Sequence, residues 1–282
     1  MEIIRKSNIL HEIIKRHKFK ESIGFVPTMG ALHDGHISLI KKAREENDIV
    51  IVSIFVNPLQ FGEGEDYTIY PRTIESDSKI CKENGVDILF FPEEASFYNN
   101  PHLTTVSVKK ISEPLCGRTR PGHFDGVCTV VLKLFNIVMP DNAYFGKKDF
   151  QQYSIIKKMV SDLSLDINII GMPIIREING LAKSSRNKYL SDDELESSIY
   201  INQSLFDSLE KIRNGEKSSD VITRNIKEII NKGKYNKIQY VEILSTDNFL
   251  PVKNITNNSL IAVAVFCGKT RLIDNIFISD YL

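Results

Sequence analysis

Short apolar runs alternate with amphipathic stretches through the first half of the chain. The apolar runs are rich in β-branched and aromatic residues and have the length of buried strands, whereas the segments between them space their apolar residues as a helix does. The pattern predicts strands at 23–26, 49–56 and 86–91 and helices at 36–47 and 73–84. Strands that alternate with helices are typical of a parallel sheet with crossover helices, so we predict a doubly wound α/β fold.

The alternation continues to about residue 175 and then changes. Up to that point the predicted elements are helices at 126–138 and 151–162 and strands at 142–145 and 167–171. Beyond it come two amphipathic helices and three β-rich runs, at 191–213, 220–232, 238–244, 260–266 and 272–278. This second pattern predicts a smaller C-terminal α+β domain. We place the boundary in the polar stretch 176–188 and divide the chain into domains 1–178 and 179–282.

Composition and charge narrow the function classes. Of the 282 residues, 42% are hydrophobic and 26% are charged, a normal balance for a globular protein. The 36 basic residues equal the 36 acidic ones, so no net field favours nucleic acid or an anionic membrane. The chain has no apolar run of membrane-spanning length, and its first residues do not resemble a signal peptide. We therefore expect a cytoplasmic protein without membrane or nucleic-acid partners.

The cysteines agree with this expectation. They are scattered without paired spacing, at Cys81, Cys116, Cys128 and Cys267. Such spacing fits reduced thiols in the cytoplasm better than a disulfide or zinc framework.

The most informative segment is FVPTMGALHDGH, at residues 25–36. It begins in a predicted strand, turns at its glycines and enters a helical pattern, so His33 and His36 lie where a strand gives way to a helix. The unpaired N–H groups of a helix start suit phosphate, and two imidazoles add donors to a phosphoryl oxygen. Two alternatives remain: ordinary turn residues, or a structural metal site, for which further ligands are lacking nearby.

Two amide side chains follow the second predicted strand. In open α/β sheets, ligands bind beyond the carboxyl ends of the strands, so Asn57 and Gln60 should lie in the same crevice as the two histidines. Their amides suit a small polar substrate. Taken alone, however, the Asn-Pro pair favours the simpler interpretation of a turn.

Segment 115–124 is a basic loop that contains glycine. Arg118, Arg120 and His123 could meet an anion there, but the segment by itself favours a solvated charged loop.

Segment 145–153 repeats the order of strand, glycine and helix. Lys147 and Lys148 stand at the helix start, where the helix dipole disfavours cations, which suggests a bound anion nearby. Asp149 is either the helix N-cap or an acceptor for a ribose, and Gln152 lies about one turn into the helix.

Segment 183–187 combines two hydroxyls with two cations in a polar stretch. Small donors beside an arginine make a good mobile phosphate clamp, although a capping loop explains the composition equally well. Together, these segments indicate an α/β enzyme that binds a polyanion beside a small polar molecule.

Taken in order, these segments resemble those of the pantoate–β-alanine ligase family. The matching blocks follow the family's order over about 160 residues: PTMGALHDGH at 27–36, FVNPLQF at 55–61, YPR at 70–72, RPGHFDGV at 120–127, GKKDFQQ at 146–152 and GLAKSSRN at 180–187. The HxGH element alone would indicate only the wider nucleotidylyltransferase superfamily. The C-terminal 95 residues are compatible with the family but less diagnostic.

The resemblance implies a Rossmann-like ATP- and pantoate-binding domain, a C-terminal lid domain and a homodimer. It implies a two-step ligation in coenzyme A precursor biosynthesis, in which pantoate attacks ATP to give pantoyl adenylate and pyrophosphate. β-Alanine then displaces AMP to form pantothenate. ATP is a substrate, and Mg²⁺ accompanies it. The alternative is a nucleotidylyltransferase that adenylylates a different small acceptor.

Residue roles also follow from the resemblance, position by position. The implied catalytic residues are His36, as proton donor, with His33, Lys148 and Arg186. Gln60 is implied for both pantoate and β-alanine, Gln152 for pantoate, and Asp77 for the metal. The implied ATP-binding residues are Met29, Gly30, Ala31, Leu32, His33, Asp34, Gly35, His36, Gly146, Lys147, Lys148, Asp149, Ile175, Lys183, Ser184, Ser185 and Arg186.

A few positions depart from the commonest family pattern. Lys183 replaces an apolar residue, Asn179 an acidic one and Lys147 a frequent glutamate. Residues 97–100 stand where a Tyr-Pro turn is usual. None of these departures removes an implied catalytic residue.

Overall fold

The computed structural model describes residues 1–98 and 101–282, so half of the departing segment 97–100 lies outside the described residues. The chain forms two compact units. The first comprises Met1–Ser112, Cys116–Lys147 and Gln151–Pro173, and the second comprises Glu113–Leu115, Lys148–Phe150 and Ile174–Leu282. The domain boundary expected between residues 178 and 179 stays a prediction.

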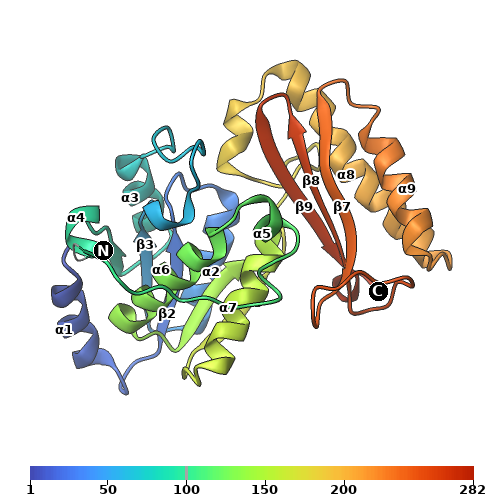
Figure 1. Ribbon diagram of the computed structural model, residues 1–282. Helices are drawn as coiled ribbons and strands as arrows, with labels where there is room; N and C mark the ends of the chain where they lie inside the picture. The colour runs from blue at the N-terminus through green and yellow to red at the C-terminus, as the bar shows by residue number, and fades with distance from the viewer. Residues whose placement is uncertain (99–100) are drawn as a thin grey trace. The chain divides into compact units, whose positions relative to one another are not determined.

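A six-stranded parallel sheet forms the centre of the first unit (Figure 1). Its strand order is β1-β4-β3-β2-β5-β6. The strands are β1 (Glu2–Ile4), β2 (Ile23–Thr28), β3 (Ile49–Ile54), β4 (Ile88–Phe90), β5 (Asn142–Gly146) and β6 (Asn168–Met172). From β2 the chain builds outward through β3 to β4 and later returns to add β5 on the other side. The switch point between β2 and β5 confirms the doubly wound prediction.

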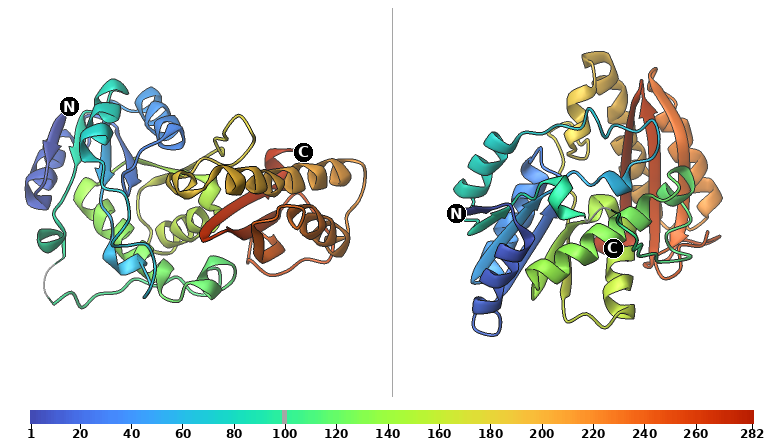
Figure 2. Two further views of the ribbon diagram at one scale, coloured as in Figure 1. Left: turned by 90° about the horizontal axis from the view of Figure 1, so that it is seen from above. Right: turned by 60° about the vertical axis from the view of Figure 1, so that its left-hand side comes forward.

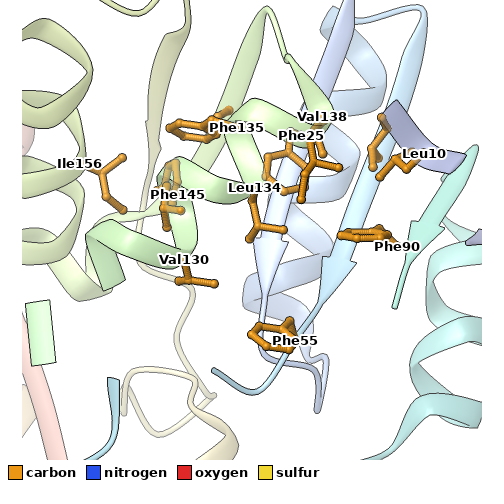
Figure 3. Close-up of a cluster of buried hydrophobic side chains, with 14 of the residues drawn as sticks. Leu10, Phe25, Phe55, Phe90, Val130, Leu134, Phe135, Val138, Phe145 and Ile156 are labelled. Carbon is orange, nitrogen blue, oxygen red and sulfur yellow. The ribbon is translucent and has the colours of Figure 1, made fainter. Parts of the chain in front are cut away.

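The strands alternate their buried side chains between two apolar layers, as a sheet covered on both faces requires. Ile49 and Ile51 belong to one layer with α1 (Ser7–His17), α6 (His123–Val138) and α7 (Phe150–Asp162). Val50 and Val52 belong to the other layer with α2 (Asp34–Glu46) and α3 (Ile74–Glu83). Figure 3 shows the first layer, where Phe25, Phe90 and Phe145 of the sheet lie near side chains of α1, α6 and α7.

Short elements complete the first unit. They are α4 (Glu94–Phe97), α5 (Cys116–Thr119), the 3-10 turn η1 (Pro58–Gln60) and the start of η2 (Lys147–Asp149). The predicted strands and helices are all present, with small shifts at their ends. α2 begins at Asp34 rather than residue 36, because His33 caps it, and β3 ends at Ile54 rather than residue 56. β1 and α1 are not among the predicted elements.

The second unit has a three-stranded antiparallel sheet and two helices (Figure 2). Its elements are α8 (Asp192–Arg213), α9 (Ser219–Ile230), β7 (Asn236–Ser245), β8 (Ser259–Cys267) and β9 (Thr270–Phe277), with 3-10 turns η3 (Ser185–Tyr189) and η4 (Ile278–Asp280). Apolar residues of α8 and α9, among them Leu205 and Ile226, pack with Ile243, Val263 and Ile276 of the strands. The predicted small α+β unit is confirmed.

Within the described parts of the chain, no helix has both the length and the apolar character that a membrane crossing needs.

Candidate active site

The predicted histidine turn follows β2 directly. Gly30 and Ala31 both have left-handed backbones, with φ of 85° and 51°, which reverses the chain before α2 begins. The Thr28 hydroxyl donates to the carbonyl of Ser53 on β3 at 2.8 Å and accepts the N–H of Gly30 at 3.1 Å. The turn is therefore attached to the carboxyl end of the neighbouring strand.

The two histidines form a reciprocal cap at the start of α2. His33 Nδ1 accepts the N–H of Gly35 at 3.2 Å, and His36 Nδ1 accepts the N–H of His33 at 3.3 Å. The two rings lie 4.2 Å apart, centroid to centroid. Because Nδ1 accepts in both rings, a neutral ring carries its proton on Nε2. In that tautomer, Nε2 is the donor nitrogen of each ring.

A buried carboxylate on α3 holds the same turn. Asp77 is 1% exposed, and its two oxygens accept the N–H groups of Ala31 and Leu32, each at 2.9 Å. The Thr73 hydroxyl also donates to Asp77, at 3.0 Å. These contacts stabilise the left-handed backbone that brings His33 to the start of the helix.

Gln60 is positioned beside this turn by η1. Its amide nitrogen lies 2.9 Å from Met29 Sδ, and its amide oxygen accepts from Asn57 at 3.1 Å. Asn57 itself caps η1 through the N–H of Leu59 and accepts the hydroxyl of Tyr98 at 2.8 Å. Gln60 thus contacts Met29 of the histidine turn, whereas the Asn57 side chain stabilises η1. The crevice expected to join both amides to His33 and His36 stays a prediction.

A closely packed glycine lets α6 support η1. The Asn57 amide donates to the carbonyl of Gly126 on α6 at 3.1 Å. A Cβ on Gly126 would lie 2.2 Å from the carbonyl oxygen of Leu59, so only glycine permits this approach.

The segment with Arg120 and His123 is not the solvated loop that its composition favoured. Arg120 binds the Glu65 carboxylate through Nε and Nη2, each at 2.6 Å, and donates from Nη1 to His123 Nε2 at 2.9 Å. His123 is 9% exposed and donates from Nδ1 to the carbonyl of Gln60 at 2.8 Å. Arg120 and His123 instead belong to a partly buried network that orients the backbone of Gln60. Arg118, the other predicted cation of the segment, is exposed. Glu65, the ion-pair partner of Arg120, lies 55 residues away along the chain.

The end of β5 supplies the next predicted residues. Gly146 ends the strand, and Lys147 begins η2. β5 pairs with β2, so these residues end at the same edge of the sheet as the histidine turn. On α7, Gln151 is 6% exposed and uses its amide to hold Cys116 N–H at 3.1 Å and the Ile111 carbonyl at 3.0 Å. The neighbouring Gln152 is half-buried and is the better candidate for a substrate.

In the second unit, Lys148 and Asp149 continue η2. Lys148 Nζ lies 3.7 Å from the Asp149 carboxylate, and the side chain of Lys148 is 22% exposed. The amide of Asn275 on β9 donates to the Lys148 carbonyl at 2.8 Å. This segment is therefore fixed by its backbone.

The predicted phosphate loop also lies in the second unit. Lys183 N–H donates to the Ile175 carbonyl at 2.9 Å, and Lys183 Nζ pairs with Glu177 at 3.1 Å. The Ser184 hydroxyl caps η3 by accepting the N–H of Arg186 at 3.2 Å. Ile175 and Lys183 are thus neighbours, and Ser185 and Arg186 form the first turn of η3.

Within residues 1–98 and 101–282, the side chains do not fit a metal ion held by the protein alone. The described residues include no group of three or more His, Cys, Asp or Glu that could hold one. Asp77 is committed to two N–H groups and a hydroxyl, which makes it a poor magnesium ligand.

The doubly wound sheet, with imidazoles, amides and a lysine at its carboxyl edge, defines a nucleotide-binding α/β enzyme. A family model described as pantoate-beta-alanine ligase matches residues 2–277, and the chain belongs to that family.

Relatives and solved structures agree with this assignment. A pantothenate synthetase of Caldicellulosiruptor bescii is 51% identical over 279 residues, covering 99% of both chains. The crystal structure of pantothenate synthetase from Thermus thermophilus superposes with a TM-score of 0.94 at 38% identity, covering 99% of both chains. A pantoate-beta-alanine ligase from Francisella tularensis, complexed with beta-gamma ATP and beta-alanine, has a TM-score of 0.80 at 39% identity, covering 99% of this chain and 98% of that one. The chain is accordingly an enzyme of the ligase class.

Proposed function

We propose that this enzyme joins pantoate to β-alanine at the expense of ATP, through pantoyl adenylate, with release of pyrophosphate and then AMP. The observation that carries the proposal is the family match over residues 2–277, which includes the histidine turn and the Gln60 turn. The relative complexed with a form of ATP and with beta-alanine supports the same substrates.

The histidine turn acts on ATP in the first step. The dipole at the start of α2 favours the negative charge of the phosphates, and His36 donates the Nε2 proton to the oxygen where negative charge develops. His33 fixes the cap and adds a second Nε2–H donor. Met29 to Asp34 and Gly35 line the same ATP site.

Cations offset the repulsion between a carboxylate and a triphosphate. Two like unit charges 4 Å apart repel by about 4 kcal/mol at an effective dielectric of 20. Lys148, Lys183 and Arg186 bind the phosphates, with donors from Ser184 and Ser185. The rest of the nucleotide is bound by Gly146, Lys147, Asp149 and Ile175. Mg²⁺ enters with ATP, as part of the substrate, and neutralises the leaving pyrophosphate.

Gln60 and Gln152 bind pantoate and direct its carboxylate to the α-phosphorus. In the second step Gln60 also holds β-alanine, whose amine attacks the acyl carbon and displaces AMP. The protein supplies no nucleophile, so positioning and electrostatics provide the acceleration. The C-terminal domain acts as a lid that excludes water from the acyl adenylate.

Analysis of the products tests this function. The enzyme is incubated with ATP, pantoate and β-alanine, and each product is quantified. We expect AMP, pyrophosphate and pantothenate in equal amounts, with no pantothenate when β-alanine is omitted. Formation of ADP, or release of pyrophosphate without pantothenate in the complete mixture, would contradict the proposal. The second result would favour the alternative nucleotidylyltransferase.

We further propose that the enzyme is a cytoplasmic homodimer. The small-molecule substrates support the location, as does the finding that none of the four cysteines is in a disulfide. Sedimentation equilibrium measures the oligomeric state directly, and a monomer mass of 32.1 kDa at all concentrations would contradict the dimer.

A further inference from the structure

Two adjacent polar residues of β9 are buried in the second unit. Asp274 is 2% exposed and Asn275 is 5% exposed. Burial of a carboxylate is unfavourable unless it is paired, and burial of an amide is unfavourable unless it is hydrogen-bonded. Neither residue belongs to a motif that the reaction uses, so their partners indicate why they are buried.

Asp274 holds the segment that leads into the phosphate loop. Its carboxylate binds Arg176 in a bidentate pair, at 2.6 and 3.1 Å. Arg176 also donates to the Gly180 carbonyl at 3.1 Å and forms a backbone bridge with Ala182. Lys183, the first residue of the predicted phosphate loop, directly follows Ala182 in the chain. The ion pair thus fixes the hairpin 176–182, and with it the first residue of the loop.

Asn275 holds the other cationic segment of the same unit. Its amide nitrogen donates to the Lys148 carbonyl at 2.8 Å, and two residues further along β9 the ring of Phe277 lies 5.2 Å from that of Phe150. The N–H of Asn275 in turn donates to Asp274 at 2.8 Å. Successive residues of a strand point to opposite sides, so one short piece of β9 holds two separate segments.

We propose that Asp274 and Asn275 are positioning residues for ATP, which set the Lys148 segment and the 183–186 loop in register through contacts to Lys148 and Arg176. The inference rests on the proposed function, in which Lys148 and Arg186 bind the phosphates. Neither β9 residue contacts substrate in this proposal. Displacement of a binding group by about 1 Å lowers a rate by as much as about 100-fold.

The test replaces Asn275 by aspartate or alanine and measures KM separately for ATP and for pantoate. Asn275→Asp keeps the size of the side chain but removes its donor. We expect the KM for ATP to rise about 10-fold or more, while the KM for pantoate changes less than about twofold. Asn258→Ala, at an exposed position before β8, is the matched control and should change neither constant.

Arg176→Lys and Asp274→Asn test the other half of the pair. Both keep a polar side chain but lose the bidentate geometry, and we expect the same selective rise in the KM for ATP. Should the Asp274 variant fail to fold, the Asn275 variants still decide the question. Equal increases in both KM values, or an unchanged KM for ATP in a folded Asn275 variant, would overturn the inference.

Lys148→Ala, measured alongside, separates this inference from the proposed function. A raised KM for ATP in Lys148→Ala together with normal Asn275 variants overturns only the positioning role. An unchanged KM for ATP in Lys148→Ala would instead remove Lys148 from the nucleotide site.

Discussion

The Asp77 carboxylate accepts the backbone N–H of Ala31 at 2.9 Å, from a position 46 residues further along the chain. The residue implied as a metal ligand thus stabilises the peptide backbone of the histidine turn. Because Ala31 has a left-handed φ of 51°, which costs a non-glycine residue free energy, the turn depends on this support.

Replacing Asp77 by alanine should lower both stability and activity. Without the carboxylate, the buried N–H groups of Ala31 and Leu32 lose their hydrogen-bond acceptor, which costs about 1–3 kcal/mol for each group. We expect urea denaturation to show a free energy of unfolding lowered by about 3 kcal/mol, and a reduced kcat. Glu75→Ala, on the exposed face of the same helix, should change the stability by less than about 0.5 kcal/mol. Recovery of activity at high Mg²⁺ would show that Asp77 binds the metal after all.

His36→Ala should lower kcat with little effect on the fold. Removing one donor to a developing negative charge typically costs about 100- to 1,000-fold. Rates of pantoate-dependent pyrophosphate release, with circular dichroism as a check on folding, measure the effect. His17→Ala, which alters an exposed histidine paired with Glu21, serves as control. Normal turnover in His36→Ala would exclude the residue from the mechanism.

Gln60→Ala should weaken the binding of pantoate and β-alanine far more than the binding of ATP. Its amide lies at Met29, beside the nucleotide turn, but the proposed partners are the two smaller substrates. Measurement of the KM for each of the three substrates tests this prediction. The control is Leu59→Ala, at the neighbouring exposed position. An equal rise in the KM for ATP would place Gln60 in the nucleotide site instead.

The Glu65–Arg120 pair should make the free energy of unfolding decrease as the solution becomes acidic. Burial raises the pKa of Glu65, but the hydrogen bonds and charge of Arg120 outweigh it and hold that pKa below the ordinary 4.5. A carboxyl group whose pKa is lower in the folded state stabilises the protein at pH values above the unfolded-state pKa. This stabilisation is lost as the pH falls through the folded-state pKa. Stability measured from about pH 6 down to about pH 3 should therefore fall less steeply in Arg120→Met. An unchanged slope would contradict this contribution.

Three of the four cysteines should resist alkylation in the folded protein. Burial raises the pKa of the Cys81 and Cys128 thiols to about 12 and of the Cys267 thiol to about 11, so they stay protonated near neutral pH. Mass spectrometry after iodoacetamide treatment should find only half-buried Cys116 modified, and all four modified in urea. Rapid labelling of Cys81 or Cys128 without denaturant would indicate an opening of the core.

The periodic elements were predictable because their apolar spacing reflects which side they bury. Alternating residues such as Ile49 and Val50 face different layers of the sheet, so every residue of that strand except Ser53 is apolar. α1 carries the same signal, since Leu10 and Ile14 lie four positions apart and both are fully buried, although it is not among the predicted helices. β1 has three residues, too few for any period to appear.

The site was less predictable, because its supports come from distant parts of the chain. Nothing local to Asp77 indicates that it binds the turn at Ala31, and nothing near His123 indicates that it bonds the carbonyl of Gln60. The composition of segment 115–124 suggested solvation for the same reason: its partner Glu65 is remote. The resemblance to the family implies the residue roles, whereas only the three-dimensional structure shows the contacts that support them.

The pairing of β2 with β5 has a kinetic consequence. Gly24 pairs with Asn142, and the N–H of nearby Ile23 donates to Asp141 at 2.8 Å, across 118 residues of chain. During synthesis, β2, β3 and β4 are therefore complete long before β5 emerges, and β2 meanwhile exposes an unpaired edge. We expect nascent chains stalled before residue 140 to aggregate or recruit chaperones, and chains extended past residue 172 to be protected.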